Sequence, residues 1–312
     1  MKTKTFGFLL ACLCFSLPSF SQVNLHFCDK QEAREKLGSE DITTRQWSTF
    51  DYESRLGRKG GTKQELLQFI TDQALDWNAG AKAKLEKAAE VLNAEIKKEG
   101  YNLPIPSLVD LLTTTMAEEG GAGGYTRDKY IVVEDHLDKA RQEWVNTLLA
   151  HELFHVLTRN NPEFRRDMYK LIGFTVTDEE LVYPADLADR RISNPDVNRF
   201  DSYATFTING KPQDCTMAIF ASKPYDGGSF FDYIQIGLLA MEDGKLIQKD
   251  GKSVIYSISD AADFFDKVGK NTDYVINPEE ILAENFSMVL TGKGKVPSQW
   301  LYDQIKSYLK NR

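Results

Sequence analysis

One segment, residues 139–159, constrains the fold of this chain more than any other. Its apolar residues between Trp144 and Leu157 predict a helix that is largely buried in a core. The same segment contains the run His151-Glu152-Leu153-Phe154-His155. Because residues four apart lie one turn above each other on the same helix face, both imidazoles can reach one cation from the same side. The fold therefore has to accommodate a polar, metal-competent site on a buried helix.

This spacing provides the geometry that a zinc ion needs, and Glu152 lies on the adjacent flank of the helix. From there its carboxylate can hold and deprotonate a water without being a ligand itself, so Glu152 is the predicted general base. The plainer interpretation is a pair of core histidines satisfied by neighbouring groups. The chain has only four histidines and two of them form this pair, so we favour a zinc site with His151 and His155 as ligands.

A catalytic zinc site takes a third protein ligand and keeps one position open. In metzincins a glycine and a third histidine extend the motif, but this chain has Thr158 and Asn161 at those positions, which excludes that class. His26 and His136 lie outside any helical or otherwise pre-organised setting. We therefore expect a carboxylate as the third ligand.

The candidate carboxylates lie in residues 277–286. Asn277 can cap a helix that begins here, and Pro278 suits its first turn. Glu280 and Glu284 then share one polar stripe, while apolar residues cover other parts of the helix. The plainer interpretation of this pair is a solvated acidic helix face.

With a histidine pair on one helix and two carboxylates on a later one, the chain resembles the gluzincins, such as the thermolysin-like peptidases. The resemblance implies that Glu280 is the third zinc ligand, and that Glu284 is the acceptor that steadies His151 or His155. Gluzincins usually have an aspartate at the second position. The glutamate found here leaves open that Glu280 and Glu284 exchange these roles.

A wider resemblance joins the chain to a group of poorly characterised bacterial proteins with a HELFHVL helix and a later PEEILAxNF helix. It extends from about Thr62 to Leu290 and implies an α+β, zincin-like metallopeptidase fold. Such a fold would have a mixed sheet, an active-site helix and a β-rich insertion before the third-ligand helix. The resemblance implies no substrate. Besides the two helices, the matching stretches are Gly124-Tyr125-Thr126-Arg127, Ile131-Val132-Val133, Leu171-Ile172-Gly173-Phe174, Ser193-Asn194-Pro195-Asp196 and Gly269-Lys270-Asn271-Thr272-Asp273-Tyr274.

The remaining patterns predict how the chain is organised. Residues 22–61 lack clear periodicity and are expected to form an irregular N-terminal arm, followed by one catalytic domain over residues 62–312. Alternation and turn residues predict a β-rich part of that domain at about 200–250. Helices are expected over 62–75, 81–98, 139–159, 162–172, 278–291 and 298–310, and strands over 107–117 and 125–133.

Residues 1–21 have the composition of a secretory signal peptide. Lys2 and Lys4 precede an apolar run from Phe6 to Leu17, and small residues then supply a cleavage site. The run is shorter than the roughly 20 residues of a membrane-spanning helix, and no later segment matches it, so we expect no membrane span. The expected location is secreted or periplasmic, and a lipoprotein anchored through Cys12 is the alternative.

Removal of this segment would leave two cysteines, Cys28 and Cys215, in an exported protein. We hypothesise a Cys28–Cys215 disulfide, with two separate buried thiols as the alternative, because connectivity depends on geometry that a sequence does not contain. The formal charge of −8 would become −10 without Lys2 and Lys4, since 36 basic residues would then face 46 acidic ones. Such an acidic surface disfavours nucleic acid as a partner.

Together these features predict a secreted zinc-dependent metallopeptidase that acts on peptides or proteins. Zinc would polarise the scissile carbonyl, Glu152 would take the proton of an activated water, and a donor would hold the oxyanion. No histidine follows His155, so a tyrosine or an arginine has to serve as the donor, and Tyr203 and Tyr274 are the candidates. The resemblance further implies that the strand at 125–133 is the substrate-binding edge. The alternatives are a secreted zinc-containing binding protein or inactive peptidase scaffold, and a cell-wall amidase.

Overall fold

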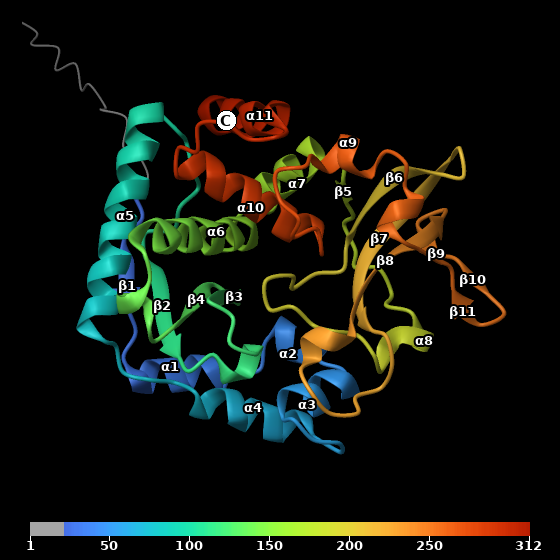
Figure 1. Ribbon diagram of the computed structural model, residues 1–312, viewed down its shortest axis with the longest axis horizontal. Coiled ribbons are helices and arrows are strands. Elements are labelled where there is room, and N and C mark those ends of the chain that lie inside the picture. Colours follow the sequence, from blue (N-terminus) through green and yellow to red (C-terminus); the bar gives the residue numbers. More distant parts are fainter. Residues whose placement is uncertain (1–21) are drawn as a thin grey trace, which may run out of the picture.

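The computed structural model describes residues 22–312 and has a mixed α+β architecture (Figure 1). The predicted signal peptide and Cys12 lie outside the described residues. Two β-sheets form separate parts of the molecule, and the helices α6 (Gln142–Asn160) and α10 (Pro278–Leu290) pack side by side above the first of them. These two helices contain all the metal ligands predicted from the sequence.

The first sheet has the strand order β1-β2-β4-β3. Its first three strands run parallel, and β3 is an antiparallel edge strand paired with β4. Their bounds are Leu25–Phe27 for β1, Val109–Thr114 for β2, Tyr130–Glu134 for β4 and Gly124–Arg127 for β3.

Helices cover both faces of this sheet. Alternate side chains point to opposite faces, so Leu111 and Ile131 join the core under α5 and α6, whereas Leu112 and Val132 join the core over α1 and α4. Burial on both faces explains why β2 and β4 appear in the sequence as nearly continuous apolar runs. The covering helices are α5 (Ala79–Glu99), α1 (Lys30–Leu37) and α4 (Lys63–Asp72).

The second sheet is antiparallel, with the order β12-β8-β7-β6-β5 and with β9 added on β8. It corresponds to the β-rich part predicted at about 200–250. Two of its turns, Asn209-Gly210 and Asp243-Gly244, form tight hairpins in which both central residues have positive φ. The strands are β5 (Thr175–Val176), β6 (Ser202–Ile208), β7 (Lys211–Ala221), β8 (Ile234–Glu242), β9 (Lys245–Leu246) and β12 (Ile255–Tyr256), and β10 (Gln248–Lys249) pairs separately with β11 (Lys252–Ser253).

Several of the predicted helices have clear caps or starting residues in the structure. Thr62 forms a capping box at the start of α4, Gly100 ends α5 in the left-handed conformation, and Asn277 caps α10. Pro162 begins α7 as expected. The remaining helices are α2 (Ile42–Gln46), α3 (Thr49–Arg55), α7 (Pro162–Leu171), α8 (Ala185–Ala188), α9 (Phe264–Val268) and α11 (Gln299–Asn311).

The irregular course expected for residues 22–61 is wrong. This segment supplies β1 of the first sheet and then the helices α1, α2 and α3. Each of these helices begins with a capping box, at Asp29, Asp41 and Ser48. They are too short to show a helical period in the sequence, which is why periodicity alone missed them.

The single strand expected over residues 125–133 is also wrong. The segment forms a hairpin of β3 and β4, with Asp128 in the left-handed conformation at its turn. This places β3, rather than the whole segment, at the edge of the sheet.

The Cys28–Cys215 disulfide is wrong as well. Both thiols are free and buried, and they lie in different hydrophobic clusters, Cys28 over the first sheet and Cys215 on β7 of the second. The alternative prediction, two separate buried thiols, is confirmed.

Among residues 22–312, no helix is long and apolar enough to cross a membrane.

Candidate metal centre

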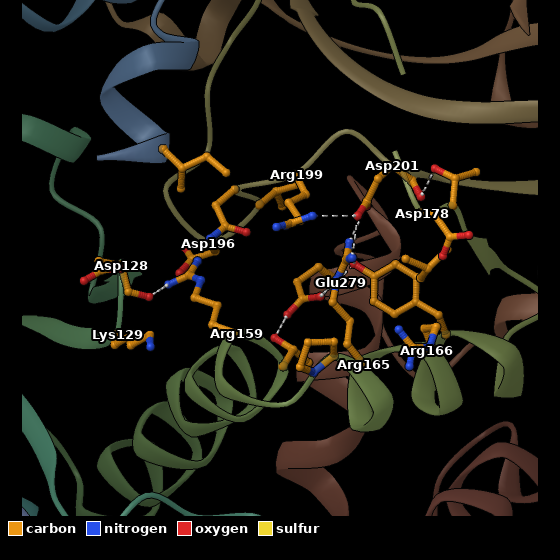
Figure 2. A pocket seen from close by; sticks show the side chains of 18 residues that line it. Asp128, Lys129, Arg159, Arg165, Arg166, Asp178, Asp196, Arg199, Asp201 and Glu279 are labelled. Carbon is orange, nitrogen blue, oxygen red and sulfur yellow. Dashed lines mark hydrogen bonds and ion pairs between the residues drawn. The ribbon is translucent and has the colours of Figure 1, made fainter. Parts of the chain in front are cut away.

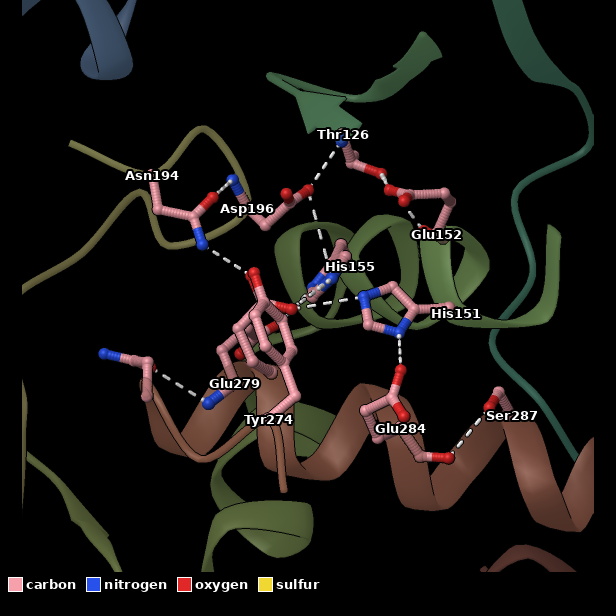
Figure 3. A network of polar contacts seen from close by, with 12 residues as sticks. Thr126, His151, Glu152, His155, Asn194, Asp196, Tyr274, Glu279, Glu284 and Ser287 are labelled. Carbon is pink, nitrogen blue, oxygen red and sulfur yellow. Dashed lines mark hydrogen bonds and ion pairs between the residues drawn. The ribbon is translucent and has the colours of Figure 1, made fainter. Parts of the chain in front are cut away.

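The packing of α6 against α10 brings His151, His155 and Glu280 together (Figure 3). One ligand atom from each residue lies within 4.8 Å of the other two. His155 and Glu280 are buried and His151 is nearly so. We call these three residues the α6–α10 cluster.

The two nitrogens of His151 contact different carboxylates. Nδ1 lies 3.1 Å from Glu284 Oε1, and Nε2 lies 3.1 Å from Glu280 Oε2. Burial lowers the pKa of His151, but the hydrogen bonds to Glu280 and Glu284 outweigh it and raise that pKa well above its usual value. Glu284 and Glu280 thus hold the His151 ring from its two nitrogens.

His155 has the same arrangement with a different partner. Its Nδ1 lies 3.3 Å from Glu279 Oε1, while its buried Nε2 has no hydrogen-bond partner. The nearest carboxylate oxygens to Nε2 are Glu280 Oε2 at 3.7 Å and Asp196 Oδ1 at 3.9 Å. A buried polar atom without a partner is costly in a folded protein, and a bound cation would satisfy it. The donor set of two imidazoles and one carboxylate therefore fits a metal ion.

Glu279 was not singled out in the sequence, because it lies off the stripe shared by Glu280 and Glu284. Its side chain is buried and accepts hydrogen bonds from Tyr169 Oη at 2.7 Å and Thr158 Oγ1 at 2.5 Å. Burial raises the pKa of Glu279, but the hydrogen bond from His155 and other contacts outweigh this and lower it. Glu279 is therefore held as an anion that orients His155.

Glu280 is fixed from the side opposite the histidines. Its Oε1 accepts a hydrogen bond of 2.5 Å from Asn194 Nδ2, and only 1% of its side chain is exposed. Burial would raise the pKa of Glu280, but the hydrogen bond with His151 and the nearby imidazole of His155 lower it well below the usual range. Asn194 lies in a loop far from Glu280 in sequence, so no local pattern predicts this contact.

Thr126 on the edge strand β3 holds two carboxylates at once. Its hydroxyl donates to Glu152 Oε2 at 2.7 Å, and its backbone N–H donates to Asp196 Oδ1 at 2.6 Å. Glu152, His155 and Asp196 form a second group whose ligand atoms lie within 4.8 Å of one another. Burial and the charge of Glu152 raise the pKa of Asp196 well above its usual value. Glu152 thus faces the free Nε2 of His155, with Asp196 on the same side.

Gly124 allows β3 to approach α6 this closely. A Cβ atom at this position would lie 3.1 Å from Leu148 Cδ1 and 3.3 Å from Glu152 Oε1, which is tighter than ordinary contact. The glycine that begins β3 therefore allows the edge of the sheet to lie against the helix of the site.

The two tyrosines named as candidate donors differ in position. The ring of Tyr274 lies beside the α6–α10 cluster in Figure 3, and 45% of this residue is exposed to solvent. Partial burial and nearby carboxylates, Glu280 first among them, raise the pKa of Tyr274 above its usual value, so its hydroxyl stays protonated. Tyr203 instead lies on β6, paired with Thr175 of β5, and none of its hydrogen bonds within residues 22–312 joins it to the histidines.

A cavity of about 300 Å³ adjoins the cluster, because Thr158, Asp196 and Glu279 line it (Figure 2). Five basic and five acidic side chains line this cavity, so its formal charge is balanced. Its strongest ion pair joins Arg165 to both oxygens of Asp201 at 2.6 and 2.8 Å. The cavity therefore gives no sign of selecting an anionic or a cationic ligand.

Comparison with family models, with curated proteins and with solved structures finds no match for this chain. The interpretation of the site therefore rests on its own geometry and on the resemblance of its motifs.

Proposed function

We propose that this protein is an exported zinc metallopeptidase of the gluzincin kind, with a zincin-like catalytic domain. One observation supports this most strongly. Each histidine has its Nδ1 engaged by a carboxylate, so that both Nε2 atoms face Glu280, and Nε2 of His155 is buried without a partner. Outer carboxylates that fix the tautomer of a histidine are typical of metal-ligating imidazoles.

The donor set favours zinc and a catalytic rather than a structural site. Two imidazoles and one glutamate are the ligands of catalytic zinc in several peptidases, whereas structural sites usually close with four protein ligands. When bound to His151, His155 and Glu280, zinc would act as a Lewis acid that polarises a carbonyl and lowers the pKa of a water.

The other residues of the site fit the remaining steps of peptide hydrolysis. Glu152 would take the proton of the attacking water and deliver it to the leaving amine, while the Thr126 hydroxyl keeps its carboxylate in place. Tyr274, protonated and partly exposed at the cluster, would donate a hydrogen bond to the oxyanion. The edge of β3 would pair with the backbone of an extended peptide. The peptide would then replace Asp196 as the acceptor of the hydrogen bond from the Thr126 N–H.

The test combines metal analysis with a peptide-library assay on the purified chain. We expect hydrolysis that a chelator abolishes and zinc restores. Glu152→Gln should keep zinc and lose hydrolysis, because it removes the base but no ligand. Glu143→Gln is the matched control, since Glu143 is an exposed residue on the same helix. Zinc binding without hydrolysis of any peptide in the library would instead indicate a zinc-containing scaffold.

A further inference from the structure

A second group of metal-ligating side chains lies on the first sheet, on strands that contribute nothing to the α6–α10 cluster. It consists of His26 on β1, Cys28 directly after the end of that strand, and Asp110 on β2, and we call it the β1–β2 cluster. His26 and Asp110 are directly paired in the parallel ladder, and Cys28 is two residues from His26 on the same face. Paired strands therefore hold the three side chains in fixed register.

All three ligand atoms converge on one point. Nδ1 of His26 lies 2.9 Å from Asp110 Oδ1 and 3.7 Å from Cys28 Sγ, and the three atoms lie within 4.8 Å of one another. A single ring nitrogen either carries a proton or offers a lone pair, so it can serve as donor to Asp110 or as acceptor from Cys28, but not as both. A cation at the point of convergence would satisfy all three groups.

The separations suit a tetrahedral ion. Ordinary zinc bonds to sulfur, nitrogen and oxygen place neighbouring ligand atoms about 3.3 to 3.6 Å apart. The sulfur–nitrogen distance of 3.7 Å already fits, and the nitrogen–oxygen distance of 2.9 Å has to widen by about half an ångström. Imidazole and thiolate ligands select soft or borderline metals such as zinc over calcium or magnesium.

The charges around the cluster set the strength of binding. Lys36 Nζ of α1 lies 2.7 Å from Asp110 Oδ2, which leaves Oδ1 facing His26 but adds a positive charge nearby. Glu32 Oε1 lies 4.0 Å from His26 Nε2 and opposes that charge. A cation therefore binds here more weakly than it would without Lys36.

We propose that His26, Cys28 and Asp110 bind a second transition-metal ion, of the zinc type, that ties β1 to the first sheet. The proposal does not depend on the peptidase activity, because it involves none of the residues of the α6–α10 cluster.

The experiment is a titration of the purified, metal-free chain with Co²⁺ alone, followed by absorption spectroscopy. We expect two equivalents to bind, with a thiolate-to-cobalt charge-transfer band that appears with the weaker one. Cys28→Ser should remove the band and one equivalent, whereas Cys215→Ser, which alters the other buried thiol, should change neither. One equivalent without a thiolate band in the parent chain would overturn the proposal.

Two further variants guard against a folding defect at the buried Cys28. His26→Gln, at a half-exposed position, should lower the affinity of the second equivalent at least tenfold and leave the first unchanged. Lys36→Gln should raise the affinity of the second equivalent several-fold, because it removes the competing ammonium. If the β1–β2 cluster had only a structural role, Lys36→Gln would not raise the affinity of the second equivalent. A thiolate band in a chain that hydrolyses no peptide would reject the proposed peptidase activity and leave the second metal site standing. Peptide hydrolysis by a chain that shows no thiolate band would reject the second metal site and leave the peptidase activity standing.

Discussion

The α6–α10 and β1–β2 clusters offer similar donor atoms in different surroundings. In the first, two carboxylates hold the Nδ1 atoms of the histidines and leave Nε2 of His155 buried without a partner. In the second, His26 is 39% exposed at its side chain, and Lys36 already neutralises Asp110. A pre-organised metal site is therefore recognised by the ligand atoms that its surroundings leave without a partner, and not by the type of ligand alone. We therefore expect the first cluster to bind its metal more tightly.

The sharpest way to separate the clusters is to remove a ligand from one of them. Glu280→Ala should lower zinc affinity at the α6–α10 cluster by much more than the roughly 100-fold that loss of an outer partner costs. It should leave cobalt binding at the β1–β2 cluster unchanged. Competition with a chelator measures the zinc affinity, and the cobalt absorption spectrum of the same variant measures binding at the β1–β2 cluster. Full zinc occupancy in Glu280→Ala would show that Glu280 is not a ligand.

A smaller effect is expected from the outer carboxylates that contact the Nδ1 atoms of the histidines in the α6–α10 cluster. Glu279→Gln should lower zinc affinity by roughly 10- to 100-fold, because it weakens the group that orients His155. Glu284→Gln should cost less, since its side chain is 30% exposed and water can replace it. Glu163→Gln on the exposed face of α7 is the control. Equal affinities in all three variants would contradict the proposed roles.

The pH dependence of metal binding tests the electrostatics of the α6–α10 cluster. Burial opposes protonation of His155, but Asp196, Glu279 and Glu280 raise its pKa to about 10 in the metal-free protein. A metal has to displace this proton, so zinc affinity should rise about tenfold per pH unit for each displaced proton between pH 6 and about 9. Zinc affinity that is flat over this range, measured by chelator competition at each pH, would contradict the raised pKa.

The same proton affects the stability of the metal-free fold. Because the folded-state pKa lies above the unfolded value of 6.5, the protonated imidazole stabilises the fold fully below that pH. This contribution is lost as the pH rises through about 10, and bound zinc should remove the dependence. Denaturant unfolding with and without zinc measures the difference.

The smallest predicted effect concerns the contact of Thr126 with the base. Thr126→Val keeps the β-branched shape but removes the hydroxyl that donates to Glu152, so hydrolysis should fall roughly tenfold, the size expected for one hydrogen bond to a charged group. Thr126→Ser should retain most activity, and both variants should keep their zinc. Loss of zinc in Thr126→Val would point to a structural role.

The sequence predicted the elements that have local signals. Helical spacing pairs His151 with His155, and Glu280 with Glu284, because a helix repeats within one turn. Caps such as Asn277 mark where such a helix begins. The β-rich part followed from the alternation of its strands, whereas the α+β class was implied by the resemblance. No helical period marked the helices of residues 22–61, because these helices are too short to show one.

Contacts between distant segments could not be predicted in this way. Asn194 reaches Glu280 across 86 positions, and His26 pairs with Asp110 across 84. Glu279 carries a local signal only in hindsight, as a carboxylate in the first turn of a helix that proves to be buried. Thr126 contacts Asp196 because β3 is an edge strand, which the hairpin turn between β3 and β4 brings about. Periodicity did not predict this contact, since it did not separate β3 from β4.

The decisive experiment is X-ray absorption spectroscopy of the chain loaded with one equivalent of zinc. We expect a first shell of nitrogen and oxygen only, including two imidazoles, because the tighter site is formed by His151, His155 and Glu280. A sulfur atom in that shell would place the tighter metal at Cys28, and it would contradict the assignment of the α6–α10 cluster as the principal metal centre.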